Sequence, residues 1–311
     1  MRMSKIIVIT GPTATGKTAL GAMLAGGLEG EIVSADSMQV YKHMDIGTAK
    51  PTEKEKLGIV HHMLDVVSPC EEYSVARYVS DASQCIDDIF SRGKLPLLVG
   101  GTGLYIDSLL NGREFSVRGD IELRRSLEDD YDTMGADMML ERLRELDPPS
   151  AARLHPNDKK RIVRALEVYY SSGKTISQHD AGTKLTAPRY EAIKFALTFA
   201  DRNELYKRID RRVDIMFEAG LEREVRLLLD MGVSPDSTAM QAIGYKEVVG
   251  AIVGDYDMNA AVEMIKQGSR RYAKRQLTWF RRDEQIRWIT WDEAPDIEAC
   301  AQRIIAELRD I

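Results

Sequence analysis

An eight-residue glycine motif near the N-terminus constrains this chain more than any other feature. The motif occupies residues 11–18 and reads GPTATGKT. It follows an apolar run at residues 5–10, which has the composition of a buried strand, and it precedes a helix-forming stretch at residues 19–25. Two glycines let the backbone curl so that successive N–H groups point into one anion-sized nest at a helix N-terminus. The sequence therefore predicts a phosphate-binding loop, with Lys17 reaching the outer phosphate and Thr18 ligating Mg²⁺.

The motif does not say which compound carries the phosphates. They could belong to a nucleotide that is hydrolysed, to a phosphoryl donor or to another compound, and the alternative to a functional site is an ordinary glycine turn. The residues expected at the phosphates are Gly11, Pro12, Thr13, Ala14, Thr15, Gly16, Lys17 and Thr18.

Composition places the chain among folded globular proteins. Of its 311 residues, 44% are hydrophobic and 30% are charged. No apolar stretch approaches the ~20 residues that would span a bilayer, and the N-terminus lacks the long apolar region of a secretory signal. Cys70, Cys85 and Cys300 lie far apart without C-x-x-C spacing, which suits a reducing compartment and argues against structural zinc. We expect a cytoplasmic protein with no membrane partner.

The distribution of charge says more than its sum. A net charge of −6 alone argues against a nucleic-acid partner. Two stretches, residues 159–164 and 270–282, are nevertheless strongly basic. In the second stretch the basic residues Arg270 and Lys274 are one helical turn apart, so the cations form a ridge that can contact a phosphate backbone. The alternative is a solvated helix face that pairs with acidic side chains.

The order of the apolar runs predicts an α/β fold. Apolar runs alternate with amphipathic stretches over the first hundred residues, as in parallel βαβ units. Residues 112–188 show mostly helical periods, and a strand-like run resumes at residues 192–198. We expect a parallel-sheet core like that of P-loop NTPases, built from residues 1–111 and 189–311, with a mostly helical insertion at 112–188.

Three polar elements should meet at one edge of this sheet. They are the glycine motif, residues 36–37 after one predicted strand, and residues 100–103 after another. Ligands of such sheets collect at the carboxyl ends of the strands. The strand at residues 97–99 ends in glycines and Thr102 rather than in the acidic residue that many phosphate-loop NTPases use. Asp36 is the remaining carboxylate, and it could act as a base, cap the following turn or bind Mg²⁺ through water.

Five stretches in the same order carry a resemblance to a known family. The most specific is SADSMQVYKHMDIGTAKPT at residues 34–52. The others are the motif at residues 11–18, LLVGGTGLY at 97–105, HPND through RALEV at 155–168, and AKRQLTWF at 273–280. With these stretches the chain resembles the tRNA dimethylallyltransferases, also called tRNA isopentenyltransferases. It lacks the zinc-finger extension of some eukaryotic relatives, and so is similar to the compact bacterial form.

The resemblance implies a reaction and the residues that carry it. A dimethylallyl group would pass from dimethylallyl diphosphate to the exocyclic amine of the adenosine 3′ of the anticodon, nucleotide position 37, releasing diphosphate. The glycine motif would then hold a leaving group, with Mg²⁺ as cofactor. By similarity, the catalytic residues are Asp36 as the presumed base, Thr102 at the reaction centre and Arg212 on the diphosphate. The sequence alone does not exclude the neighbouring Arg211.

The resemblance also implies contacts with tRNA. A base stacked in the anticodon loop cannot reach a crevice, so the adenosine should be flipped out of the loop. The helical insertion and the basic stretches would hold the RNA, and the protein is expected to act as a monomer. The residues expected at the RNA are Asp36, Ser37, Met38, Gln39, Thr102, Arg124, Lys160, Arg161, Ile162, Val163, Arg164, Ala242, Ile243, Gly244, Tyr245, Lys246 and Glu247.

Three other functions fit parts of the sequence. A small-molecule kinase would use the same loop with ATP and would normally carry an arginine-rich lid. A prenyltransferase of free adenine nucleotides would share the loop and Asp36 but would need no RNA-sized insertion. A non-enzymatic nucleotide switch or RNA-binding module would keep binding after Asp36→Ala.

Overall fold

The computed structural model describes residues 5–112, 120–184 and 187–309. The chain forms two compact units, one made of Met1–Leu110 with Tyr190–Ile311 and the other of Asn111–Arg189. Each boundary differs by one residue from the position expected from sequence. No helix in the described ranges has both the length and the apolar character that crossing a bilayer requires.

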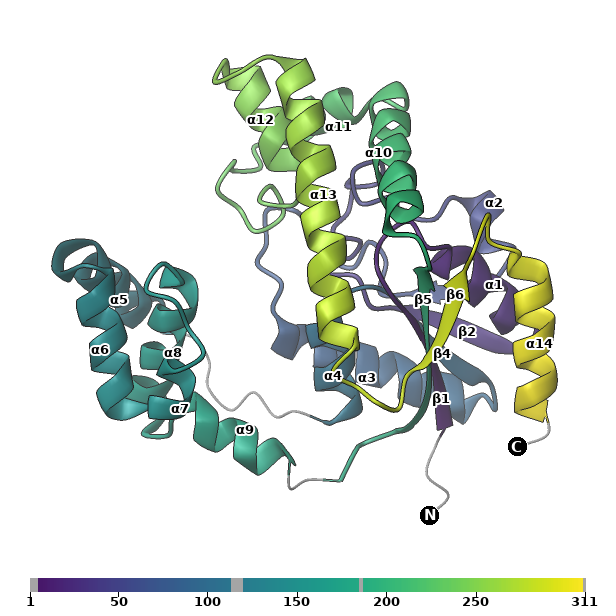
Figure 1. Ribbon diagram of the computed structural model, residues 1–311, viewed down its shortest axis with the longest axis horizontal. Helices are drawn as coiled ribbons and strands as arrows, with labels where there is room; N and C mark the ends of the chain where they lie inside the picture. Colours follow the sequence, from purple (N-terminus) through teal and green to yellow (C-terminus); the bar gives the residue numbers. More distant parts are fainter. Residues whose placement is uncertain (1–4, 113–119, 185–186, 310–311) are drawn as a thin grey trace. The chain divides into compact units, whose positions relative to one another are not determined.

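The first unit is built on a six-stranded sheet in which every described pair of neighbours is parallel (Figure 1). This confirms the predicted α/β class. In spatial order the strands are β3 (His61–His62), β2 (Gly30–Ser34), β4 (Leu95–Val99), β1 (Lys5–Thr10), β5 (Glu191–Phe199) and β6 (Arg287–Trp291). The helices of this unit are α1 (Lys17–Gly27), α2 (Glu53–Lys56), α3 (Val75–Ser91), α4 (Gly103–Leu110), α10 (Arg202–Glu218), α11 (Leu221–Asp230), α12 (Tyr245–Val253), α13 (Met258–Phe280) and α14 (Ile297–Arg309).

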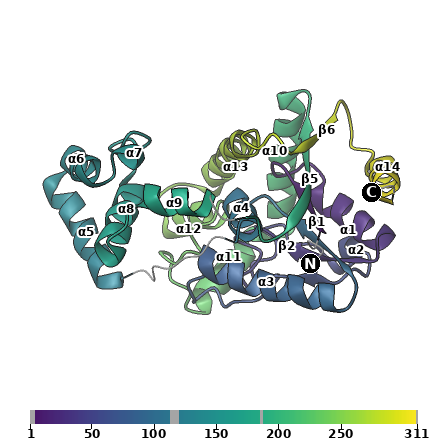
Figure 2. The same ribbon diagram turned by 90° about the horizontal axis from the view of Figure 1, so that it is seen from below.

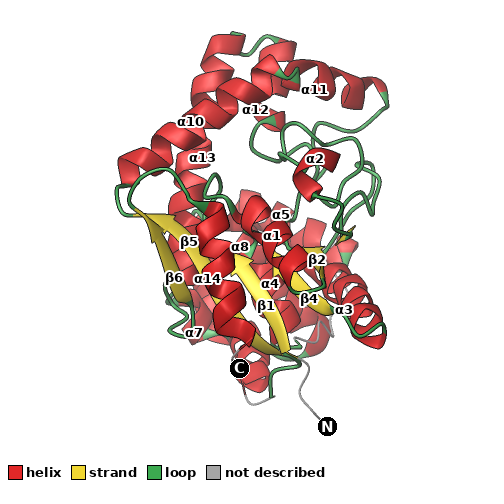
Figure 3. Ribbon diagram, turned by 90° about the vertical axis from the view of Figure 1, so that its right-hand side faces the viewer, coloured by secondary structure: helices red, strands yellow, loops and turns green. Residues whose placement is uncertain are grey.

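Helices cover both faces of the sheet, which explains why its strands are apolar runs rather than alternating ones. On β1, Ile7 and Ile9 pack in the core that α1 and α14 complete (Figure 3). Ile6 and Val8, which alternate with them along the strand, pack on the opposite face in a second core with α3 and α4. These two helices lie beside one another (Figure 2). Because β1, β2 and β4 are parallel, their carboxyl ends lie at the same end of the sheet. The cores on the two faces of the sheet hold them there.

The second unit is helical, as its sequence predicts. Its helices are α5 (Ile121–Met134), α6 (Ala136–Leu146), α7 (Pro148–Ala151), α8 (Lys159–Ser172) and α9 (Ile176–Lys184). Leu127, Leu143 and Leu166 belong to its own buried core. The buried Asp147 caps α7 through Ser150 and also accepts a bond from Ser177 N at the start of α9. The unit therefore has its own apolar core, and a buried carboxylate joins α7 to α9 within it.

Two local predictions differ from the structure. The apolar pattern of residues 241–253 predicts a helix over that whole range. Helix α12 begins only at Tyr245, because Gly244 has a φ of +103° that no α-helix accommodates. Asn157 and Asp158, which follow Pro156, predict a cap for the next helix, α8. Asp158 does occupy the N-cap, yet its carboxylate accepts a bond from His155 N instead of from the helix.

Candidate active site

The glycine motif forms a tight loop between β1 and α1 that other parts of the first unit hold in place. Gly11 has a φ of +127°, and a Cβ there would lie 2.4 Å from the carbonyl oxygen of Leu197, so only glycine fits. The Trp291 indole donates to Thr15 O at 3.1 Å. The loop opens onto the N-terminus of α1, which starts at Lys17 without a side-chain cap. Its free N–H groups are therefore available to an anion.

Lys17 lies inside this loop and donates to the Pro12 carbonyl at 2.6 Å. Burial, followed by the charge of Arg212, lowers the pKa of Lys17 from 10.5 to about 7, although the charge of Asp36 opposes both. Near neutral pH the free protein thus holds this ammonium only partly protonated. A bound anion would favour the charged form and draw a proton onto the lysine.

A proton should accordingly be taken up when an anion such as diphosphate binds in this loop. With a pKa of about 7 for Lys17 in the free protein, uptake at this residue should approach about 0.9 proton at pH 8 and vanish near pH 6. Affinity should fall as pH rises above about 7. Calorimetry in buffers of different ionisation heat measures the uptake. In Lys17→Arg the side chain stays charged, so any proton uptake that remains comes from the ligand. Equal uptake by the two proteins would therefore contradict the assignment to Lys17.

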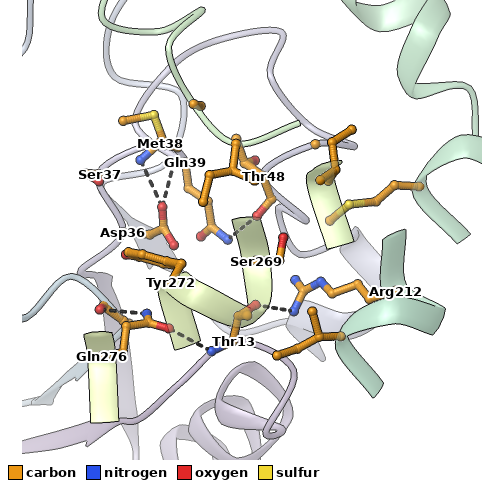
Figure 4. A pocket seen from close by; sticks show the side chains of 18 of the residues that line it. Thr13, Asp36, Ser37, Met38, Gln39, Thr48, Arg212, Ser269, Tyr272 and Gln276 are labelled. Atoms are coloured by element: carbon orange, nitrogen blue, oxygen red, sulfur yellow. Dashed lines mark hydrogen bonds between the residues drawn. The ribbon is translucent and has the colours of Figure 1, made fainter. Parts of the chain in front are cut away.

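Asp36 follows β2 and both caps a turn and faces a pocket. Its Oδ1 accepts from Met38 N at 2.9 Å and from Gln39 N at 3.3 Å. Figure 4 shows the other carboxylate oxygen directed away from this turn, toward the ring of Tyr272, which also lines the pocket. Two of the interpretations left open by sequence are therefore compatible, because one oxygen caps while the other remains for chemistry.

Two glycines after β4 allow close approaches of neighbouring segments. A Cβ on Gly100 would lie 2.2 Å from Ala35 O, and one on Gly101 would lie 2.3 Å from Gln276 Nε2. Thr102 accepts a bond from Ser37 N at 3.1 Å through its hydroxyl. The structure thus places Thr102 behind Ser37, which itself lines the pocket.

Arg212 reaches the same place from α10. Its guanidinium donates to the Thr13 hydroxyl at 3.2 Å. Burial lowers the pKa of Arg212 below its ordinary value, although the charges of Asp36 and Glu55 oppose this shift. Arg211 is exposed, so of the two neighbours the geometry brings Arg212 to the glycine motif.

These groups surround one pocket of about 420 Å³ within the first unit (Figure 4). That volume is in the range of about 300–1,000 Å³ found for small-molecule sites. One part is polar and carries cations, and another is apolar. Its polar wall includes Thr13, Lys17, Thr18, Asp36, Ser37, Gln39, Thr48 and Arg212, and its apolar wall includes Met38, Val99, Ile209, Val213, Met216, Ile243 and Ile265.

Helix α13 supplies a pocket wall that sequence reasoning missed. Ser269, Tyr272 and Gln276 recur at helical spacing and all line the pocket. Gln276 accepts from Thr13 N at 3.0 Å and donates to Gly101 O at 2.9 Å, and so joins two loops. Burial raises the pKa of Tyr272 to about 12, with the charge of Asp36 the next cause. The spacing of these polar residues on one face of α13 was the available signal.

Most of the residues expected at the RNA in the first unit fall into two groups, while Thr102 and Gly244 are not among the residues that line the pocket. Asp36, Ser37, Met38, Gln39, Ala242, Ile243 and Lys246 line the pocket. Tyr245 is fully buried, and Glu247 accepts from Gly244 N at 2.8 Å as a buried cap. The expectation that Tyr245 and Glu247 line an RNA surface is therefore wrong for their side chains, because they support the segment from inside.

A similar division holds in the second unit. Ile162 and Val163 belong to its buried core, so their side chains are not placed for RNA contact. Arg124 and Arg164 both bind the buried Glu167, at 3.1 Å and 2.8 Å. Lys160 and Arg161 are exposed.

The basic stretch on α13 is only partly available. Arg270 binds both carboxylate oxygens of Asp210, at 2.5 and 2.6 Å, and so belongs to an ion pair within the first unit. Lys274 and Arg275 are exposed, and Arg275 lines the pocket. Pairing with an acidic side chain therefore holds for Arg270, whereas contact of Lys274 and Arg275 with a phosphate backbone stays a prediction.

No group of three or more His, Cys, Asp or Glu residues in the described ranges is arranged to hold a metal ion. Thr18, the ligand expected from sequence, lines the pocket beside Lys17. Mg²⁺ commonly takes one or two protein oxygens and fills its other positions with water and substrate phosphates. The donors present fit that arrangement.

Sequence comparisons connect the chain to known proteins. The family model described as IPP transferase matches residues 39–283, and one described as isopentenyl transferase matches residues 4–68. The tRNA dimethylallyltransferase of Acetivibrio thermocellus is 49% identical over 94% of this chain and 93% of the relative. That of Desulforudis audaxviator is 48% identical over 97% of each.

Solved structures agree with the sequence comparisons. A full-length tRNA isopentenylpyrophosphate transferase from Bacillus halodurans is 40% identical with a TM-score of 0.72, covering 99% of this chain and 97% of that one. A eukaryotic dimethylallyltransferase acting on tRNA is 31% identical with a TM-score of 0.82, covering 99% of this chain and 79% of that one.

Proposed function

Because the chain belongs to the IPP transferase family, we propose that it transfers a dimethylallyl group from dimethylallyl diphosphate to tRNA. The acceptor is the exocyclic amine of the adenosine 3′ of the anticodon, position 37. The observation that carries the proposal is a single pocket with a phosphate loop at one side and the carboxylate of Asp36 at another. The apolar part of the wall, which includes Ile209, Val213 and Met216, suits a five-carbon chain.

The transfer exchanges one bond for another. The amine nitrogen forms a bond to the first carbon of the dimethylallyl group while the bond from that carbon to the diphosphate oxygen breaks. Its electron pair leaves on the diphosphate, where N–H groups of the loop, Lys17 and Arg212 offset the negative charge. The amine loses one proton, which Asp36 accepts directly or through water. An aryl amine is a weak nucleophile, so positioning and departure of diphosphate supply most of the rate gain.

Thr18 is the residue that would hold Mg²⁺. Its hydroxyl lies in the pocket wall next to Lys17, where diphosphate oxygens would supply further ligands. When bound, the ion neutralises charge on the leaving group. The protein residues orient the diphosphate in the same place, since Arg212 and Thr13 are already bonded to each other.

The second unit contributes RNA contacts through its exposed cations. Lys160 and Arg161 begin α8 and are exposed. Replacing both by glutamate should weaken tRNA binding and lower the magnitude of its logarithmic salt slope by about 1.4 to 1.8, because each phosphate contact contributes about 0.7 to 0.9. Affinity for dimethylallyl diphosphate should not change. Binding titrations at several salt concentrations measure both quantities.

Lys174→Glu is the matched control, because Lys174 is exposed beyond the other end of α8. It should leave the salt slope within about 0.3 of the wild-type value, well below the contribution of one phosphate contact. Equal slopes for all three proteins would remove Lys160 and Arg161 from the interface.

A doubly labelled donor tests the reaction class. Dimethylallyl diphosphate carries ¹⁴C in its alkyl chain and ³²P in its diphosphate, and it is incubated with protein, Mg²⁺ and tRNA. The proposal expects ¹⁴C in the RNA and ³²P in free diphosphate. Transfer of ¹⁴C to AMP but not to tRNA would favour the enzyme of free nucleotides, and phosphate transfer from ATP would favour a kinase.

A further inference from the structure

The segment from Asp45 to Lys50 has no part in the chemistry described above, although its sequence is among the most specific in the chain. Two of its residues, Gly47 and Thr48, line the pocket. Figure 4 shows Thr48 on the other side of the pocket from Thr13 of the phosphate loop. Ala242, Ile243 and Lys246 also line the pocket. We call these residues, Gly47, Thr48, Ala242, Ile243 and Lys246, the acceptor wall.

One buried carboxylate joins both parts of this wall. Glu224, on α11, accepts from the backbone N–H groups of Asp45 at 2.9 Å, Ile46 at 2.8 Å and Gly47 at 3.1 Å. It also accepts from the Tyr245 hydroxyl at 2.6 Å, at the start of α12. Glu224 is 9% exposed, so these four donors replace water as its partners.

The loop and Tyr245 also fit closely. A Cβ on Gly47 would lie 2.5 Å from Cε2 of Tyr245, so the loop approaches the ring as only glycine allows. Burial, followed by the charge of Glu224, raises the pKa of Tyr245, and the phenol therefore keeps the proton that it donates. Removing either partner would leave buried polar groups without bonds.

The same loop is bonded to the turn that holds the proposed base. Gln39 donates through Nε2 to Thr48 O at 3.2 Å and to Ala49 O at 3.3 Å. Its backbone N–H donates to Asp36 Oδ1 at 3.3 Å. A shift of the loop would therefore also move Gln39, and through it the carboxylate of Asp36.

The phosphate loop has separate supports. Gln276 and Arg212 bind Thr13, and Trp291 binds Thr15. None of these three bonds involves Glu224 or the segment from Asp45 to Lys50. Donor binding should therefore be insensitive to changes at Glu224.

We propose that Glu224 is a positioning residue that sets the acceptor wall and, through Gln39, the carboxylate of Asp36, and that it acts on the use of the RNA acceptor but not on donor binding. This inference rests on the proposed function. It deepens that function by assigning a buried carboxylate outside the pocket to acceptor recognition.

The test is Glu224→Gln, which keeps the shape of the side chain but places an amide donor against N–H and O–H donors. We expect kcat/KM for an anticodon stem-loop RNA to fall at least about tenfold, because bonds to a buried charge are lost. Affinity for dimethylallyl diphosphate should stay within about twofold, less than the loss of a single hydrogen bond. Hydrogen exchange at the amides of Asp45, Ile46 and Gly47 should accelerate.

Leu228→Ala is the control, because Leu228 is buried on the same helix and its truncation destabilises the core around α11 without removing any hydrogen bond of Glu224. It should leave kcat/KM for RNA within about threefold of wild type and should not accelerate those three amides selectively. If Glu224→Gln does not fold, Tyr245→Phe removes one of the four donors and should act in the same direction to a smaller extent.

Unchanged kcat/KM in Glu224→Gln, or a parallel loss of donor affinity, would overturn the inference. Failure of the wild-type protein to transfer anything to RNA would instead contradict the proposed function. Hydrogen exchange would then still decide whether Glu224 holds the loop, since rapid exchange of the three amides in wild-type protein contradicts that.

Discussion

Asp36→Asn should lower kcat for transfer to tRNA by about 10² to 10⁴, or about 3 to 5 kcal/mol, while tRNA binding stays near its wild-type strength. The asparagine oxygen can still accept from Met38 N and Gln39 N, so the turn after β2 is kept. The substitution thus removes the charge and proton acceptor but not the cap. Single-turnover rates with saturating donor measure the chemical step, and RNA titrations measure binding.

Asp292→Asn is the matched control, because Asp292 is an exposed carboxylate of the same unit outside the pocket. Its rate should stay within about twofold of wild type, as for most surface changes. A wild-type rate in Asp36→Asn would show that the carboxylate only caps the turn. The non-enzymatic alternative expects unchanged binding and no transfer by either protein.

Arg212→Gln should lower kcat/KM for dimethylallyl diphosphate by about 10² to 10³, as expected for the loss of one preorganised charge at the leaving group. Arg212 is the guanidinium that the structure bonds to Thr13 within the glycine motif. Arg212→Lys keeps a charge but loses the planar fork, so it should recover only part of the activity. Steady-state kinetics with donor as the varied substrate give the three values.

Arg211→Gln provides a stringent comparison. Arg211 is adjacent in sequence, carries the same charge and is exposed. Its kcat/KM should remain within about twofold of wild type, the usual range for an exposed side chain. Equal losses in Arg211→Gln and Arg212→Gln would show that the net charge of α10, rather than a group at the diphosphate, matters.

Local sequence patterns predicted most of the first unit. Apolar runs between helical stretches identified β1, β2 and β4, and residues 11–18 identified the loop, because backbone curvature there depends on glycines within the same short segment. The family predicted from five quoted stretches is confirmed by the matched models and relatives. Helix α12 starts later than its sequence predicts because of the positive φ of Gly244, which the periodicity of apolar residues does not reveal.

Contacts between distant segments could not be predicted in the same way. Gln276 meets Thr13 across 263 residues, and Glu224 meets Asp45 across 179. Such contacts depend on how whole helices pack on the sheet. For the same reason, Ile162 and Tyr245, expected at the RNA by resemblance, are buried side chains that support exposed neighbours.

The most direct test of the central claim is the identity of the product nucleoside. Unmodified tRNA is incubated with the protein, Mg²⁺ and dimethylallyl diphosphate, cut into fragments and analysed by mass spectrometry. The account predicts one added dimethylallyl group on the N6 atom of the adenosine 3′ of the anticodon, with diphosphate released in equal amount. Unmodified RNA, or a dimethylallyl group at another position, would contradict it.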